Sequence, residues 1–142
     1  MIRVAEFREF FEFYRGEKEY LLGVKLTELY HDVNYKVFVP SYLSPLDRQF
    51  GISVSDFLRR IGSLNKITDD NRYGITLYKT IPLKITHEYS INIPQSLSGL
   101  FKIVKIFNPD VIVDIPYTTF TIRSYYVYLI ARALKAVSYT HL

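Results

Sequence analysis

The sequence contains no cysteine among its 142 residues. Disulfide bonds, thiolate metal sites and cysteine nucleophiles are therefore excluded, and nothing indicates an oxidising compartment. His31 and His87 have no second ligand at metal-binding spacing, and no Ser-His-Asp arrangement follows from the spacing. We expect a cytoplasmic protein that holds no metal in this chain.

Long hydrophobic runs are also absent. Arg3 and Glu6 interrupt the apolar N-terminus, so it cannot form the core of a signal peptide. The longest uncharged apolar run lies between Arg123 and Arg132, far short of the roughly 20 residues that a membrane span needs. The sequence predicts a chain that neither enters nor crosses a membrane.

Glycine is scarce, and the sequence motifs of two classes of function are missing. The first predicted loop offers one glycine, Gly16, where a dinucleotide-dependent oxidoreductase needs Gly-x-Gly-x-x-Gly. The net charge of +4 is modest, the lysines and arginines are spread along the chain, and no RNP-like aromatic motif occurs. We expect no nucleic acid among the partners.

What is present is an alternation of strand and helix patterns. Residues 1–7 read as a strand, and a helix follows Gly16, with Leu22, Leu26 and Leu29 at i, i+4 and i+7. This spacing predicts that the three leucines face a sheet. Residues 35–39 are β-branched and aromatic and predict a second strand, which stops at Pro40.

The rest of the chain continues the alternation. Residues 53–65 predict a short basic helix, capped by Ser53 or Ser55, with Phe57, Leu58 and Ile61 inward. The later predictions are a strand and then a long loop from residue 74, a helix over 97–107, a buried strand at 111–113 and a helix from about 121 to 136, capped by Thr118 or Thr119. The order predicts one α/β domain over residues 1–142, a Rossmann-like, doubly wound, mainly parallel sheet.

Three segments carry a resemblance to a known family: Arg-Gly-Glu-Lys-Glu-Tyr-Leu-Leu at 15–22, Tyr-Lys-Val-Phe-Val-Pro at 35–40 and Phe-Asn-Pro-Asp-Val-Ile at 107–112. With the first strand, their order and separation resemble the N-terminal domain of family 4 glycosyltransferases, over nearly the whole chain. These are retaining enzymes of the B-type fold. The resemblance implies a nucleotide-sugar donor as co-substrate, no cofactor, and a glycan or lipid-linked acceptor.

The first loop supplies candidate substrate-binding residues, Arg15, Gly16 and Glu17. Gly16 matches the second loop glycine of the family, and a glycine before a helix lets backbone N–H groups approach a phosphate or sugar hydroxyls. The sequence departs from the family's pattern at two positions. Arg15 stands where the family has its first glycine, and Lys18 stands where the family has a glutamate. Arg15 is equally explained as a solvated surface charge.

The predicted loop after the buried strand supplies three more candidates, Asp114, Tyr117 and Thr118. Open α/β sheets bind ligands at the carboxyl ends of their strands. Each residue also has a structural explanation: Asp114 as a turn cap, Tyr117 as a core residue and Thr118 as a helix cap.

The last six residues, 137–142, have two interpretations. As a strand they would end at His141, which the resemblance makes the catalytic-centre residue. They also resemble a string produced when sequencing-adapter DNA is translated, and would then not be native. Under both interpretations we expect a truncated enzyme whose nucleotide-binding second domain is missing, and hence an inactive fragment.

Two further expectations stay open. A basic face at Arg59, Arg60 and Lys66, with Lys102 and Lys105, allows peripheral contact with an anionic membrane at its inner face, but a solvated surface explains it as well. The alternative function is a non-catalytic Rossmann-like binding domain, which predicts a closed sheet and no large exposed apolar face.

Overall fold

The computed structural model describes residues 1–8, 11, 13, 20–41, 45–68, 70–84, 90–115 and 122–140. The strands are β1 (Ile2–Arg8), β2 (Val33–Pro40), β3 (Tyr73–Tyr78), β4 (Thr80–Lys84), β5 (Ser90–Pro94), β6 (Val111–Ile115) and β7 (Val137–Thr140). The helices are α1 (Leu21–Leu29), α2 (Pro45–Gln49), α3 (Val54–Leu64), α4 (Leu97–Phe107) and α5 (Ile122–Ala133). None of the helices found there is long and apolar enough to span a membrane.

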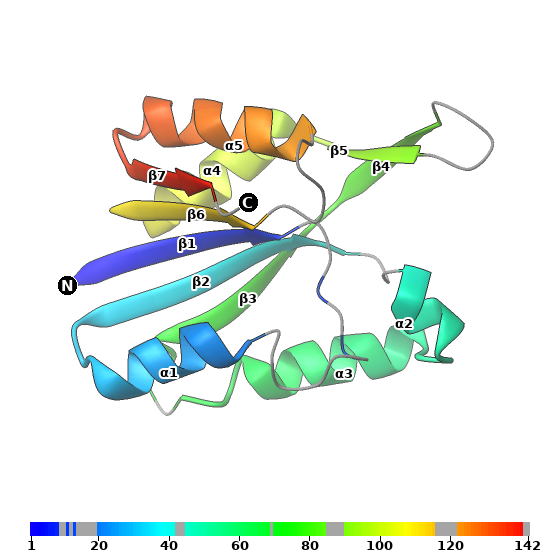
Figure 1. Cartoon of the computed structure of the whole chain (residues 1–142), viewed down its shortest axis with the longest axis horizontal. Helices are drawn as coiled ribbons and strands as arrows, with labels where there is room; N and C mark the ends of the chain where they lie inside the picture. Colours follow the sequence, from blue (N-terminus) through cyan, green and yellow to red (C-terminus); the bar gives the residue numbers. More distant parts are fainter. Residues whose placement is uncertain are drawn as a thin grey trace.

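Five strands form one parallel sheet in the order β3-β2-β1-β6-β7 (Figure 1). The chain builds outward from β1 to β3, then returns to lay β6 against the other side of β1. The strand order therefore reverses between β1 and β6. This arrangement confirms the predicted α/β, Rossmann-like, doubly wound fold.

Helices cover both faces of the sheet, α1 and α3 one face and α4 and α5 the other (Figure 1). Each face has its own apolar core. The α1–α3 side packs Val24, Val37, Phe57, Ile61 and Ile75 among its buried residues. The α4–α5 side packs residues that include Phe7, Phe38, Leu100, Val104 and Ile130.

The predicted apolar face of α1 is confirmed for Leu26, which packs against the core, and is wrong for the other two leucines. Leu22 and Leu29 are 55% and 70% exposed, and the buried residues of α1 are Gly23, Val24 and Thr27. The reason lies in the sheet beneath, because the Tyr35 and Tyr73 rings stand so high that a Cβ on Gly23 would come within 2.6 Å of the Tyr73 ring. Only the small-residue side of α1 fits over them.

Two local predictions also need correction. Leu58 points outward and is 51% exposed, while Phe57 and Ile61 are buried as expected. The strand-like segment predicted over residues 74–85 is divided into β3 and β4, and the long loop predicted after it contains β5. β4 and β5 form an antiparallel hairpin in which Pro82 pairs with Asn92. A proline fits there because both strands of a two-stranded ribbon are edge strands.

The predicted helix ends are confirmed where the structure describes them. The Ser53 hydroxyl accepts a hydrogen bond from the Asp56 backbone N–H at 3.1 Å and caps α3. At the end of α4, Asn108 adopts a left-handed conformation with φ 53° and breaks the helix before Pro109. The caps predicted at Thr118 or Thr119 fall outside the described residues.

Candidate functional site

The carboxyl edge of the sheet, where the strand order reverses, is the candidate site. β1 ends there beside β6, with Arg8 paired to Ile115. Crossovers leave this point in opposite directions, so a crevice forms at such a reversal in open α/β sheets, and ligands bind in it. Two buried charged clusters lie on opposite faces of the sheet. One lies at this edge, and the other extends from Arg8 at this edge towards the amino ends of β2 and β3.

The first cluster, on the α4–α5 side, contains Asp114. This residue was expected in a loop, but it lies inside β6, where it is 2% exposed. Arg123, in the first turn of α5, donates from Nε to Asp114 Oδ1 at 2.9 Å and is itself 4% exposed. This ion pair fixes the start of α5 to the end of β6. The other carboxylate oxygen, Oδ2, has no hydrogen-bond partner among the described residues.

Two tyrosine hydroxyls form a second buried polar contact on this face. The hydroxyls of Tyr78, at the end of β3, and Tyr126, in α5, lie 3.1 Å apart and both residues are buried. Tyr126 follows Arg123 by one helical turn, so α5 is joined to the carboxyl ends of both β6 and β3.

The second cluster lies on the α1–α3 face and is built on Glu6. Glu6 is 2% exposed, and its carboxylate accepts hydrogen bonds from the Tyr35 hydroxyl and from Arg8 Nε. Burial, with the negative charge of Glu6 as the second cause, raises the pKa of Tyr35 above its ordinary range. A neutral Tyr35 that donates to Glu6 is therefore the stable arrangement.

Tyr73 lies next to this cluster, but its hydroxyl donates no hydrogen bond to it. Its ring is stacked on that of Tyr35, with 6.2 Å between the ring centroids, and it is 1% exposed. Burial raises the pKa of Tyr73 as well, with Glu6 again the second cause. The Tyr73 hydroxyl has no hydrogen-bond partner among the described residues.

Asp47 anchors the loop that follows β1. Its side chain is fully buried, and both carboxylate oxygens lie 3.0 Å from the Phe13 backbone nitrogen, which donates to them. Asp47 belongs to the short helix α2, so this contact joins the first loop to the connection between β2 and β3. Sequence reasoning missed it, because no spacing rule relates residues 34 positions apart.

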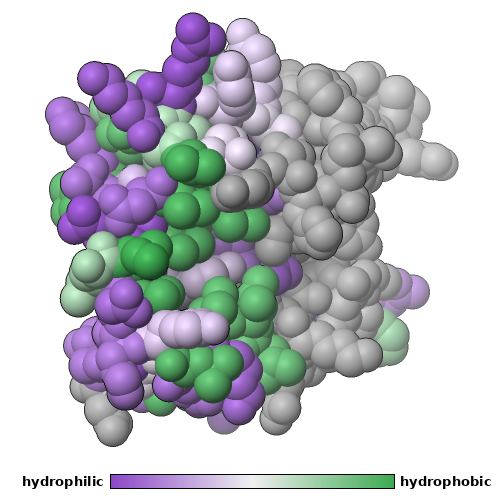
Figure 2. Space-filling model, turned by 60° about the vertical axis from the view of Figure 1, so that its left-hand side comes forward, coloured by the Kyte–Doolittle hydropathy of each residue, from purple (hydrophilic) through white to green (hydrophobic). Residues whose placement is uncertain are grey.

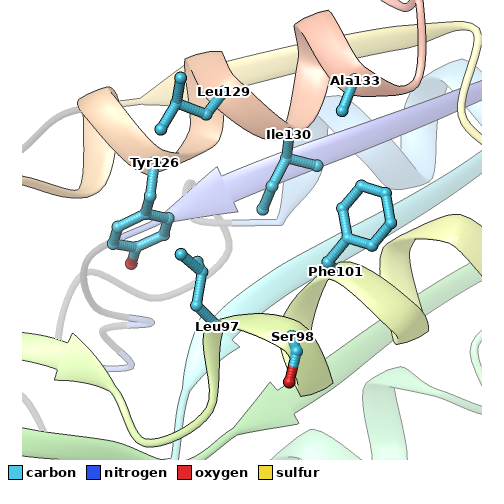
Figure 3. Close-up of a pocket in the computed structure, with 7 residues that line it drawn as sticks. All are labelled: Leu97, Ser98, Phe101, Tyr126, Leu129, Ile130 and Ala133. Atoms are coloured by element: carbon cyan, nitrogen blue, oxygen red, sulfur yellow. The ribbon is translucent and has the colours of Figure 1, made fainter.

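An apolar groove of about 370 Å³ lies between α4 and α5 (Figure 3). Leu97 and Phe101 line it from α4, and Tyr126, Leu129 and Ile130 line it from α5. Ser98 is the one other polar residue in the lining besides Tyr126. The groove offers apolar contact and too few polar groups to recognise a sugar.

Most residues singled out from the sequence lie outside the part of the chain that the structure describes. Arg15, Gly16, Glu17, Tyr117, Thr118 and His141 lie outside the described residues, as does His87. Asp114 is described, and the structure joins it to Arg123. Glu6 was missed as well, although a signal existed: a lone acid between Ala5 and Phe7 in a strand must face the opposite side from two core residues.

The comparisons add no relative. No family model, no curated protein and no solved structure matches this chain. Within the described parts of the chain, no three or more His, Cys, Asp or Glu residues gather to hold a metal ion.

Proposed function

We propose that this chain is the N-terminal, acceptor-side half of a B-type glycosyltransferase that moves a sugar from a nucleotide-sugar donor to a glycan or lipid-linked acceptor. The observation that carries the proposal is the strand order, which reverses between β1 and β6. In the sequence, Arg15, Gly16 and Glu17 follow β1, and Tyr117 and Thr118 follow β6. The resemblance in the segments at 15–22, 35–40 and 107–112 supports it.

The buried contacts near this edge suit such a role. A sugar acceptor is recognised by hydrogen bonds whose donors and acceptors are held in place before it binds. Asp47 fixes the loop after β1 at the Phe13 nitrogen, and Arg123 ties α5 to the end of β6. These two contacts therefore fix described residues next to both candidate segments.

In the proposed enzyme, His141 would lie near the reacting sugar, and a second domain would bind the nucleotide and stabilise the leaving diphosphate. The 142-residue chain with a nucleotide sugar and acceptor is then expected to form no product. Extending the chain with its downstream coding sequence is expected to give turnover. Product formation by residues 1–142 alone would contradict this division of labour.

Acceptor binding tests the edge itself. Amide chemical shifts of the chain should move around the ends of β1 and β6 when oligosaccharide or lipid-linked acceptors are added. Gly16→Val should weaken this binding about tenfold or more, because a branched side chain keeps the loop backbone away from the ligand. Gly62→Ala is the matched control, since a Cβ at Gly62 in α3 meets nothing within 4 Å. Shifts confined to other surfaces, or equal binding by the Gly16 variant, would contradict the proposal.

Peripheral contact with an anionic membrane is a finer part of this proposal. The five predicted cations do not form one face, because Lys102 and Lys105 lie in α4, on the opposite side of the sheet from α3 (Figure 1). On the α3 side, Arg59 pairs with Asp56 at 2.9 Å, so Arg60 and Lys66 are the expected contacts with the membrane. Arg60→Glu with Lys66→Glu should abolish co-sedimentation with phosphatidylserine vesicles. Unchanged co-sedimentation would contradict this contact.

The alternative of a self-contained binding domain predicts no large exposed apolar face. Leu22 and Leu29, on the outward side of α1, are 55% and 70% exposed. This apolar side favours a domain that packs against another protein surface over a self-contained one.

A further inference from the structure

The outward side of α1 is an unusual surface for a helix of nine residues. Leu21, Leu22 and Leu29 are 41%, 55% and 70% exposed, and Tyr30, directly after the helix, is 55% exposed. Figure 2 turns the side of Figure 1 that carries α1 forward, and hydrophobic side chains are spread across this face among the hydrophilic ones. We call the side formed by Leu22 and Leu29, with the half-buried Leu26 between them, the leucine face.

The leucine face cannot be turned inward by rotating α1. A Cβ on Gly23 would lie 2.6 Å from the Tyr73 ring and 2.7 Å from the Tyr35 ring, so only glycine fits at this contact. Thr27 is fully buried on the same side, and its hydroxyl donates to the Val24 carbonyl oxygen at 2.8 Å. The fold therefore holds Leu22 and Leu29 outward, while Leu26 packs partly against the core beneath α1.

The charges beside the leucine face indicate what covers it. Its flank carries one cation and one anion, Lys25 and Glu28, which lie 3.2 Å apart one turn along the helix. Their sum is zero, so an anionic membrane gains no electrostatic attraction here. The surface suits a partner with an equally apolar stripe and one charge of each sign.

A second copy of α1 has this pattern. When two helices pack antiparallel about a two-fold axis, a given flank of one helix meets the same flank of the other. The two flanks run in opposite directions. Leu22 then faces Leu29 of the other copy, and Lys25 faces Glu28. Both matches are centred next to Leu26, so one axis satisfies them together.

We propose that this chain forms a two-fold symmetric homodimer in which the leucine faces of two α1 helices pack antiparallel. Nine residues give a helix about 14 Å long, which is short for an interface that typically buries about 1,600 Å² in all. The exposed Met1, Ile2 and Tyr30 at the adjoining edge enlarge it. The dimer is therefore expected to dissociate on dilution. The proposal does not depend on the proposed function.

Sedimentation equilibrium of the 142-residue chain over a hundredfold range of concentration tests this. The wild type should shift from monomer to dimer, and Leu22→Glu should stay monomeric, with at least about tenfold weaker association. Leu58→Glu in α3 is the matched control, because Leu58 is the same residue type at 51% exposure, and it should dimerise as the wild type does. A wild type that is monomeric throughout, or equal loss of dimer in both variants, overturns the proposal.

The charges give a second test that keeps the leucines. Lys25→Glu should weaken the dimer, because the acidic side chains at positions 25 and 28 of one copy then face the same two acidic side chains of the other copy. Lys25→Glu with Glu28→Lys should restore it, since exchanging both charges keeps the two-fold match. Circular dichroism confirms that each variant is folded. Failure of the double variant to restore association, or binding of neutral or anionic vesicles that Leu22→Glu abolishes, shows a different occupant and overturns the dimer.

Discussion

The two faces of the sheet bury charge in different ways. On the α4–α5 side, Asp114 of the sheet is paired with Arg123 of a helix, so the polar contact crosses between layers. On the α1–α3 side, Glu6 is satisfied by Tyr35 and Arg8, which both belong to the sheet. The α1 helix contributes to that side by shape, through Gly23.

This difference separates two ways of attaching a helix to a sheet. The start of α5 is located by an ion pair that fails if either partner is lost. The position of α1 depends on the absence of a side chain at Gly23, and its outward surface is consequently free to carry leucines. Mutations on the two sides should therefore differ in size and in what rescues them.

The largest effect is expected for Arg123→Met. It leaves the buried Asp114 carboxylate without its cation, at a cost of about 3–5 kcal/mol in the free energy of unfolding. Adding Asp114→Leu should recover most of that loss, because no unpaired charge remains buried. Urea unfolding followed by circular dichroism measures both. If Arg123→Met lowers the free energy of unfolding by less than about 1 kcal/mol, well below the expected loss of about 3–5 kcal/mol, the ion pair does not couple the layers.

On the opposite face, Tyr35→Phe should cost about 1.5–3 kcal/mol, since it removes a hydrogen bond to the buried, charged Glu6. The same denaturation assay measures it. The effect should be smaller than that of Arg123→Met because Arg8 still donates to Glu6. A larger loss than for Arg123→Met would reverse the comparison of the two faces.

The raised pKa values of Tyr35 and Tyr73 predict how this face responds to pH. A tyrosine that ionises less readily in the folded state contributes stability that is complete below its unfolded pKa of about 10. That stability is lost as the pH rises from this value towards the folded pKa. Denaturation at increasing alkaline pH should therefore show a falling stability, and Tyr35→Phe should make the fall shallower. An equal slope in both proteins would contradict the assigned cause.

The outcome on α1 shows how far sequence reasoning reached. The doubly wound, mainly parallel sheet was predicted from the alternation of strand and helix patterns, because connections in α/β chains obey few rules. The facing of Leu22 and Leu29 failed because it depends on the height of Tyr35 and Tyr73 in other strands. The same holds for the site: Asp114 was found next to a buried strand, whereas Asp47 contacts Phe13 through a tertiary approach that no local pattern encodes.

Gly23→Ala tests the shape contact directly. Alanine favours a helix over glycine by up to about 1 kcal/mol, but here its Cβ would meet the Tyr35 and Tyr73 rings. We expect a net loss of about 1–3 kcal/mol from overpacking. Gly62→Ala, in the middle of α3 with nothing within 4 Å, should instead gain up to about 1 kcal/mol. Thermal unfolding of the two variants gives opposite signs if the close approach is real, and the same sign if it is not.

The smallest effect is expected for Tyr73→Phe, the counterpart of Tyr35→Phe one strand away. Both rings are buried and stacked, but the Tyr73 hydroxyl has no partner among the described residues. Removing an unpaired buried hydroxyl should be neutral or stabilising by about 1 kcal/mol, whereas the same change at Tyr35 breaks a hydrogen bond to Glu6. Urea unfolding of the two single variants compares them. A loss at Tyr73 as large as at Tyr35 would mean that Tyr73 also holds the buried carboxylate in place.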